Sequence, residues 1–438
     1  MNTLIERVAV AILLSLPVLA APIASPAVAA PPALLSPQIP FERVVEQLAN
    51  RDKAMRLQAV RMLKDAGYPE SAVPLAPAVV DADDEVQLEA IAAELNIFLA
   101  ERIAPRRRVG LVVEVRNRIA AEAAFSRGPL ALLSRPVPPV VLDALRRAAR
   151  DANPQVALEA LYAFGTLAVE PSGSRRRELL RPIGPDLASM VGAANVRFRH
   201  AAVRVIGRVY ERRREDELVD NTIGDAMVSV LNDRDQSVRA DAMRALGSMK
   251  YERGVQALVD QFRYFGRGQL AEAALDGIAR IAHPSSTPLL IAQLTSKEPA
   301  LKTIAIEGVA RLGDKSRLAT IESALKGENN DGVLLAGRFA SIVLSSGLMD
   351  PMADALRRPK FAARAREYLV EIAPGRSSVF RRYAQDPDAH IRSGMADVLG
   401  LAGDVAALSI LEPMRRDSDP QVAQAAERAV ARLNALRS

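Results

Sequence analysis

The chain has 438 residues and a formal net charge of +6, with 58 basic residues against 52 acidic ones. It contains no Cys, which excludes disulfides, thiolate catalysis, Cys-ligated metal sites and lipid anchors on Cys, and its three His exclude a His-rich metal cluster. Hydrophobic residues make up 49% of the chain but aromatic residues only 4%. This composition favours helices that pack closely through small side chains.

The first forty residues differ from the rest. A charged start that ends at Arg7 precedes an apolar run from Val8 to Ala21, and Ala27-Val28-Ala29 follows. This order is typical of a secretory signal peptide with an Ala-x-Ala cleavage site. Three prolines between positions 17 and 26 count against the alternative, an uncleaved N-terminal membrane anchor, because each removes a backbone donor within the length of a span. We expect a signal peptide at 1–29, a Pro-rich linker at 30–40, export to the periplasm and no membrane span in the mature chain.

One motif recurs from residue 41 to the end. Its clearest copy is Asp233-Arg-Asp235-Gln-Ser-Val238-Arg-Ala-Asp-Ala242-Met-Arg-Ala-Leu246-Gly247. Close copies begin at Asn50, Asp81, Asp151, Asp386 and Asp417. Most copies follow one another after about 30–32 residues, and two longer gaps predict degenerate copies near 112–125 and 333–345. The period indicates about twelve repeats that fill 41–438 as one domain.

Each part of the motif has a structural reason. The Asp or Asn three residues before the apolar anchor, as Asp235 before Val238, is placed as an N-cap. The anchor, the small residue four positions later and the apolar residue eight positions later form one helical stripe. We expect a glycine behind the stripe to end the helix in the left-handed conformation; such glycines are Gly165, Gly207, Gly247 and Gly400. A second helix precedes each motif, so each unit is a helical hairpin that must stack on its neighbours.

The pattern Asp-x-Asp/Asn-(Pro)-x-Val-Arg-x-x-Ala-x-x-Ala-Leu-Gly resembles the short HEAT-like repeat of the phycobilisome-lyase type, over nearly all of 41–438. The resemblance implies an all-α superhelix, a solenoid of about twelve hairpins. It also brings two enzyme precedents, phycobilin lyases and di-iron deoxyhypusine hydroxylases. The hydroxylases use His-Glu pairs, and no His-Glu dipeptide occurs here. No position can be matched to the chromophore-holding residues of the lyases.

The sequence shows no catalytic, cofactor-binding or metal-binding cluster. There is no P-loop or dinucleotide fingerprint, and no nucleophile elbow. His200 and His390 lie at expected helix starts, and His283 lies before a proline in a turn. We therefore expect no cofactor and no enzymatic activity, with a lyase or oxidoreductase-like enzyme as the alternative.

Arginines form the next candidate. Arg56, Arg199, Arg239 and Arg392 each follow the apolar anchor directly. We interpret them as a ladder in which each pairs with the turn Asp of a neighbouring unit, and the alternative is ligand binding. Further clusters stand at 106–108, 175–177, 197–199, 212–214 and 381–382. They leave phosphate or nucleic-acid binding open as a second alternative, although a net charge of +6 over this length is mild.

The segment 261–268 is unusual because it gathers three of the seventeen aromatic residues with two arginines. Its candidate binding residues are Phe262, Arg263, Tyr264, Phe265 and Arg267. Aromatic residues with arginine are typical of interface hot spots. The preferred interpretation is that Phe262 and Phe265 fill the hairpin core while Tyr264 lies on the surface. The loops at 126–140 and 168–186 are further candidates, because binding in a solenoid often uses irregular loops.

These observations favour one function over two others. We expect an exported, non-enzymatic scaffold that presents a concave surface to a protein or peptide partner. Its candidate binding residues are the segment 261–268 and the arginines at 199, 239 and 392.

Overall fold

The computed structural model describes residues 40–100, 120–133, 135–168, 178, 180–212 and 220–436. The chain divides into two compact units, Met1–Pro40 and Phe41–Ser438, and the fold below is that of the second unit. The predicted signal peptide and nearly all of the predicted linker lie outside the described residues, as do the arginine clusters at 106–108 and 175–177. No helix in the described ranges is both long and apolar enough to span a bilayer.

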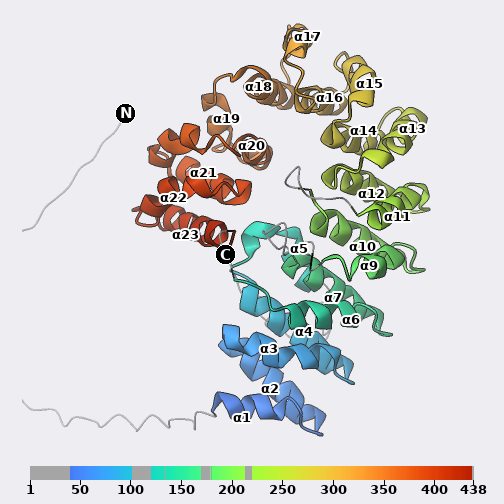
Figure 1. The fold of residues 1–438 in the computed structure, drawn as a ribbon, viewed down its shortest axis with the longest axis vertical. Coiled ribbons are helices and arrows are strands. Elements are labelled where there is room, and N and C mark those ends of the chain that lie inside the picture. The colour runs from blue at the N-terminus through green and yellow to red at the C-terminus, as the bar shows by residue number, and fades with distance from the viewer. Residues whose placement is uncertain are drawn as a thin grey trace, which may run out of the picture. The chain divides into compact units, whose positions relative to one another are not determined.

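The described residues fold into helices arranged as stacked pairs (Figure 1), and their only β-bridge joins Leu99 to Leu132. The second helix of each pair is the longer one. These second helices are α2 (Lys53–Ala66), α4 (Asp84–Phe98), α7 (Pro154–Leu167), α10 (Val196–Val209), α12 (Gln236–Ser248), α14 (Gln269–Ile281), α16 (Pro299–Arg311), α18 (Asp331–Ser345), α20 (Pro359–Ile372), α21 (Ala389–Ala402) and α23 (Pro420–Ala435).

The first member of each pair is shorter and often begins or ends in a 3₁₀ turn. These members are α1 (Phe41–Gln47), η1 (Pro69–Ser71) with α3 (Ala72–Leu75) and η2 (Ala76–Val80), α6 (Pro139–Ala148), α9 (Gly184–Met190), α11 (Asn221–Ser229) with η4 (Val230–Asn232), η5 (Glu252–Gly254) with α13 (Val255–Phe265), η6 (Pro284–Ser286) with α15 (Thr287–Gln293), η7 (Lys315–Arg317) with α17 (Leu318–Ala324), α19 (Asp350–Ala355), η8 (Ser377–Gln385), and η9 (Val405–Ala407) with α22 (Leu408–Met414).

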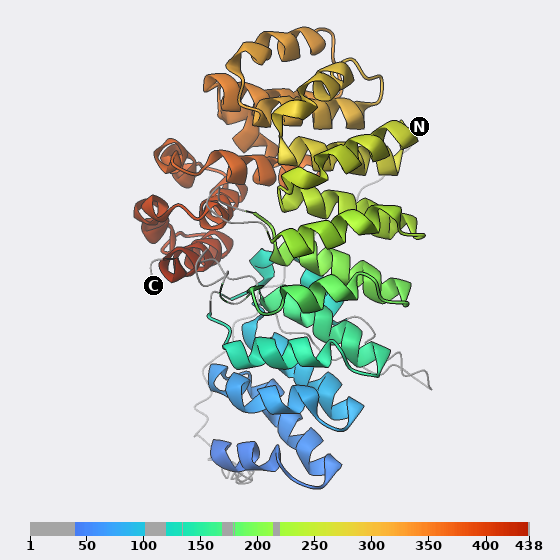
Figure 2. The same ribbon diagram turned by 45° about the vertical axis from the view of Figure 1, so that its right-hand side comes forward.

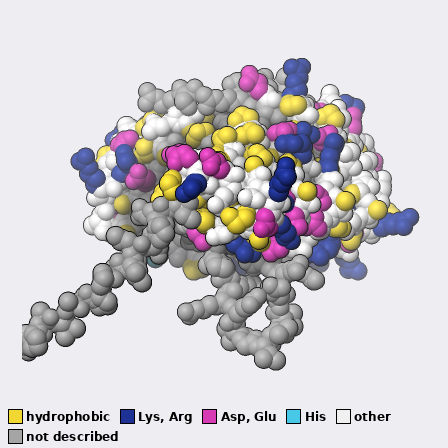
Figure 3. Space-filling model, turned by 90° about the horizontal axis from the view of Figure 1, so that it is seen from below, with side chains coloured by type: hydrophobic (Ala, Val, Ile, Leu, Met, Phe, Trp, Pro, Cys, Tyr) yellow, Lys and Arg dark blue, Asp and Glu magenta, His cyan; other side chains and the backbone are white. Residues whose placement is uncertain are grey.

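The two members of each pair form two layers. The second helices lie side by side in one row, and the first helices cover one side of that row (Figures 1 and 2). We call the opposite side of the row the inner face. At the end formed by α1 and α2, the visible surface mixes basic, acidic and hydrophobic side chains (Figure 3).

The motif's acids cap the second helices, as the sequence predicts. The carboxylate of Asp235 accepts hydrogen bonds from the backbone N–H groups of Ser237 at 2.8 Å and Val238 at 3.1 Å. The acid two residues earlier has a separate task, because Asp233 accepts from the N–H of Asp235 at 2.8 Å. The same N-cap bond recurs at Asp52, Asp83, Asn153, Asn195, Asp388 and Asp419.

Small residues set the distance between second helices. The small-residue column that the motif predicts runs through positions 59, 90, 160, 202, 242, 274, 305, 365, 395 and 426; all ten residues are fully buried, and all are alanines except Met395. A larger side chain there would push the neighbouring helix away. The closest packing in the row therefore follows from the Ala-rich composition.

The predicted helix-ending role of four glycines is wrong. Gly165, Gly207, Gly247 and Gly400 all lie inside their helices. They serve close packing instead: a Cβ at Gly247 would lie 2.8 Å from the Cα of Gly277 on α14, and one at Gly207 would lie 2.8 Å from the Cβ of Ala245. Left-handed stops do occur elsewhere, at Gly67 with φ 63° and Gly403 with φ 73°.

One of the two predicted degenerate repeats is wrong. The copy near 333–345 is α18, which packs between α16 and α20 in the row. Of the copy predicted near 112–125, residues 112–119 lie outside the described residues, and the rest takes no place in the row, because α4 packs directly on α7 and the side-chain amide of Gln87 donates to Asp151 at 2.9 Å. We call the described residues of the segment between α4 and α6 the insertion: they form helix α5 (Ala120–Ser126), which packs on α7, and the 3₁₀ turn η3 (Pro129–Ala131). The described residues therefore contain eleven pairs, in agreement with the predicted number of about twelve.

Candidate functional site

The arginines that follow the anchor form the predicted ladder. Arg199 donates through Nε and a terminal nitrogen to both carboxylate oxygens of Asp233, at 2.7 and 2.9 Å. Its other terminal nitrogen donates to the backbone carbonyls of Ala193 and Ala194, both at 3.0 Å. The hydrogen bond from Arg199 lowers the pKa of Asp233. Arg56 pairs with Asp81 and Arg392 with Asp417 in the same way.

The ladder extends beyond arginine. Lys302 occupies the same position after its anchor and pairs with Glu328 at 2.7 Å, and Gln87 on α4 does the same with Asp151. The sequence carried this signal, since each partner lies five residues before the next anchor, but a search restricted to arginine misses it. Arg199 and Arg392 thus pair with the turn acid of the neighbouring unit, as the structural interpretation predicted.

Arg239 is the exception in the ladder. Phe265 stands five residues before the next anchor, the position from which an acid pairs with each of the other ladder residues. The guanidinium of Arg239 lies 5.7 Å from the centroid of the Phe265 ring, a cation–π contact in place of an ion pair. Its terminal nitrogen donates to the carbonyl of Asp233 at 2.8 Å, and within the described part of the chain its buried Nε has no hydrogen-bond partner.

The aromatic segment divides as the preferred interpretation predicted. Phe262 is buried in the core, and Phe265 packs against it while half-buried. Tyr264 is 82% exposed and meets Phe265 edge to face, with ring centroids 4.9 Å apart. Arg263 and Arg267 are exposed. The structure places these residues with Arg239 at the end of α13. Arg199 meets Arg239 at Asp233, whose carboxylate accepts from Arg199 and whose carbonyl accepts from Arg239, whereas Arg392 belongs to a distant pair.

The two candidate loops are described only in part. The loop at 126–140 contains η3 and the start of α6. Much of the loop at 168–186, from 169 to 177 and at 179, lies outside the described residues.

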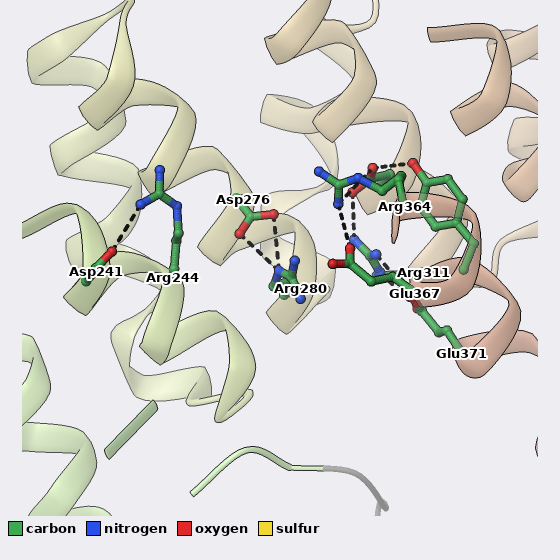
Figure 4. A network of polar contacts seen from close by, with 10 residues as sticks. Asp241, Arg244, Asp276, Arg280, Arg311, Arg364, Glu367 and Glu371 are labelled. Atoms are coloured by element: carbon green, nitrogen blue, oxygen red, sulfur yellow. Dashed lines mark hydrogen bonds and ion pairs between the residues drawn. The ribbon is translucent and has the colours of Figure 1, made fainter. Parts of the chain in front are cut away.

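A second cluster, which the sequence search missed, crosses the inner face (Figure 4). We call it the inner network. It consists of Asp241 and Arg244 on α12, Asp276 and Arg280 on α14, Glu307 and Arg311 on α16, and Arg364, Glu367, Tyr368 and Glu371 on α20. Most of these residues stand six or ten positions after their anchors, a periodicity that could have revealed the cluster.

The network is densest between α16 and α20. Arg311 donates to both carboxylate oxygens of Glu371, at 2.8 and 3.1 Å, and lies 3.3 Å from a carboxylate oxygen of Glu307. The Tyr368 hydroxyl donates to Glu307, and Arg364 lies 3.7 Å from the same carboxylate. These contacts tie the two helices together across α18.

Burial and charge act together at this point. The Glu307 side chain is fully buried and that of Arg311 is 11% exposed. Burial alone would lower the pKa of Arg311, but Glu371 and Glu307 raise it above its usual value. Burial, with Glu307 adding to it, raises the pKa of Tyr368 well above its usual value. The arginine is therefore charged and the tyrosine neutral at physiological pH.

Towards α12 the network is looser. The Nε–H of Arg280 donates hydrogen bonds to both carboxylate oxygens of Asp276, at 3.1 and 3.0 Å. Asp241 pairs with Arg244 at 3.2 Å and with Nε2 of His200 on α10 at 2.8 Å. Each arginine of the network thus faces at least one carboxylate.

The histidines have local structural partners. The Nδ1 atom of His283 caps the 3₁₀ turn η6 by accepting from the backbone N–H of Ser285, and the backbone N–H of His390 donates to the carboxylate of Asp388. Among the described residues, no group of three or more His, Asp and Glu is placed to hold a metal ion. An open hollow of about 500 Å³ lies between η8 and α22, but its lining includes Arg392 and Asp417, which already pair with each other.

Comparisons with known proteins return no family. No protein-family model matches the chain, and no curated protein matches it significantly. An engineered protein of solved structure is 18% identical, with a TM-score of 0.42, over 91% of this chain and 99% of its own. The complex of CpcE and CpcF of phycocyanin lyase from Nostoc sp. PCC7120 is 16% identical, with a TM-score of 0.39, over 57% and 93%.

Importin beta is 16% identical to the chain, with a TM-score of 0.36, over 90% of this chain and 50% of its own. The stacked helical pairs themselves confirm the prediction of an all-α, HEAT-like repeat fold.

Proposed function

We propose that the chain is an exported, non-enzymatic scaffold that binds a protein or peptide partner along the inner face. The observation that carries this proposal is the inner network: a row of fixed acidic, basic and aromatic side chains on one face of neighbouring second helices. Helical repeats present such faces as extended binding surfaces. The order of charged and apolar groups at the N-terminus supports export.

The charge of the network favours a polypeptide over a nucleic acid. Its ten residues include five carboxylates and four guanidinium groups, and the guanidinium groups are paired. A phosphate backbone binds through arginines and lysines that are free to replace its counterions. A polypeptide instead offers donors and acceptors of both signs, which matches a face where both alternate.

Site-specific photo-crosslinking in the producing cell tests the proposal. We would place p-benzoylphenylalanine at Arg244 or Arg364 on the inner face, and at Arg253 in η5 as a matched exposed control. The expected result is one protein adduct of the same mass from both inner positions and none from Arg253. Adducts from Arg253 alone, or from no position, would contradict the proposal.

A further inference from the structure

The insertion places a helix on the inner face that does not belong to any pair. Helix α5 packs on α7, and its residues also contact α10. The pairs are complete without it, because α7 already packs on α4, α6 and α10. With seven residues, α5 is too short to be stable by itself. Helix α5 is therefore an additional helix, packed on a surface that the paired helices form without it.

Polar side chains of α7 and α10 form hydrogen bonds with both ends of helix α5. Arg204 on α10 donates to Glu122 at 2.8 Å and to the Ser126 hydroxyl at 3.1 Å. The buried carboxylate of Glu159 on α7 accepts from the N–H of Ala121 at 3.0 Å. Arg204 also donates to the Tyr162 hydroxyl at 3.1 Å, which is neutral because burial raises the pKa of Tyr162 to about 12.

An aromatic anchor fills the centre of the site. Phe125 is 2% exposed and lies over Gly165, where an added Cβ would come within 3.0 Å of its ring. The Phe125 and Tyr162 rings are 5.4 Å apart. The guanidinium of Arg208 lies 3.7 Å from the Phe125 ring centroid and donates to the Phe125 carbonyl. A buried aromatic ring in a well-packed pocket, with charged groups around it, is typical of a binding hot spot.

We propose that the inner face of α7 and α10 is a helix-docking site, with α5 as its resident and exchangeable occupant. The partner that the site fits is a helical segment with an acidic residue followed three residues later by an aromatic one, as Glu122 and Phe125 are spaced. This rests on the proposed function and names the partner class of its inner face. A tethered occupant competes at an effective concentration in the millimolar range, so the partner binds after α5 leaves.

The absence of native cysteine allows a direct test of exchange. The full chain would carry either Ala124→Cys, at a buried position of α5, or Ala163→Cys, at a buried position of α7. We expect the α5 thiol to react with N-ethylmaleimide at least tenfold faster than the α7 thiol in native buffer. Arg208→Ala should speed the α5 reaction further, whereas Arg244→Ala on α12 should not. Equal rates for the two thiols would show that α5 opens only on global unfolding and would overturn the proposal.

A second experiment tests whether the face of α7 and α10 binds a helical peptide once α5 can no longer dock there. Alkylation of the Ala124→Cys variant prevents α5 from docking again, and a fluorescent peptide of residues 120–133 is then titrated in. The expected result is binding at least tenfold tighter than to the unalkylated protein, with loss of binding to an alkylated variant that also carries Arg208→Ala. No binding, or equal binding to both forms, contradicts the proposal. The crosslinking experiment does not depend on α5. If it succeeds and the thiol and peptide experiments fail, the protein is a scaffold that lacks this docking site.

Discussion

At the residue scale, one glycine shows how closely the row is packed. Gly247 on α12 faces the backbone of Gly277 on α14, and a Cβ would lie 2.8 Å from its Cα. Backbone cannot yield as a flexible side chain can, so Gly247→Ala should destabilise the protein by about 1–3 kcal/mol. Urea unfolding would measure this, with Gly192→Ala as the control because its Cβ meets only one atom, at 3.7 Å. An equal effect of both changes would contradict the packing role.

Glu94 breaks the core pattern at the same scale. It stands eight residues after its anchor, where Leu246 and Phe164 stand in other units, and its side chain is fully buried. In the described structure neither of its oxygens has a hydrogen-bond partner. Burial raises its pKa well above the usual value.

The raised pKa of Glu94 predicts a pH dependence with a definite sign. Folding favours the protonated form, so the stability that Glu94 permits is complete below its unfolded pKa and falls as the pH rises through its folded pKa. Glu94→Gln, which cannot ionise, should match the wild type near pH 4 and exceed it by about 1–3 kcal/mol at pH 8. The measurement is the free energy of unfolding at both pH values. A stability difference that does not change with pH would count against this account.

At the element scale, the ladder fixes how one second helix sits on the next. Asp233 accepts two hydrogen bonds from Arg199 of the preceding pair, and the two side chains are only 10% and 15% exposed. It also accepts from the N–H of Asp235 within its own turn. Each acid therefore joins a turn to its neighbour, and the repeated geometry orders the row although single surface pairs are weak.

A double-mutant cycle on this joint gives a testable value. Arg199→Met and Asp233→Asn should show a coupling free energy of about 1 kcal/mol in urea unfolding. The lowered pKa of Asp233 means that its contribution is present above its unfolded pKa and is lost as the pH falls through the folded value. The same cycle at pH 2.5 should therefore show a smaller coupling. Arg239 with Phe265, which lacks a carboxylate, is the matched pair whose coupling should not change with pH.

The element scale also shows what sequence can predict. Caps, stripes and the ladder are encoded by residues a few positions apart, so Asp235, Ala242 and Arg199 were placed correctly. The role of Gly247 was not, because a helix stop and a close crossing call for the same small residue. The segment that contains α5 has about the length of one repeat, so the repeat spacing alone predicted a repeat there. The inner network depends on which helices meet across α18, and this is set by stacking rather than by local spacing.

At the scale of the whole molecule, the insertion links distant pairs. Arg432 on the last helix donates to the carbonyl of Pro129 in η3 at 2.8 Å, across 303 positions of the chain. We predict that Arg432→Ala loosens this link. Spin labels at Ala123→Cys on α5 and Gln424→Cys on α23, both exposed positions, should give a narrow distance distribution in the parent chain and a broad one in the variant. An unchanged distribution would show that other contacts suffice, and exposed Arg416→Ala is the control.

Export determines where a scaffold of this kind meets its partner, and the proposed signal peptide makes a sharp prediction. Cleavage after Ala29 would leave a mature chain that begins at Ala30, with Ala27 and Ala29 as the small residues that the peptidase requires. Mass spectrometry of the intact protein from the producing cell should find this mature form outside the cytoplasm. Ala29→Phe should leave the precursor uncleaved and membrane-attached, because a large side chain does not fit the cleavage site, whereas Ala33→Phe in the expected linker should be processed normally. Full-length protein in the cytoplasm would contradict export, and the photo-crosslinking adducts would then be sought there.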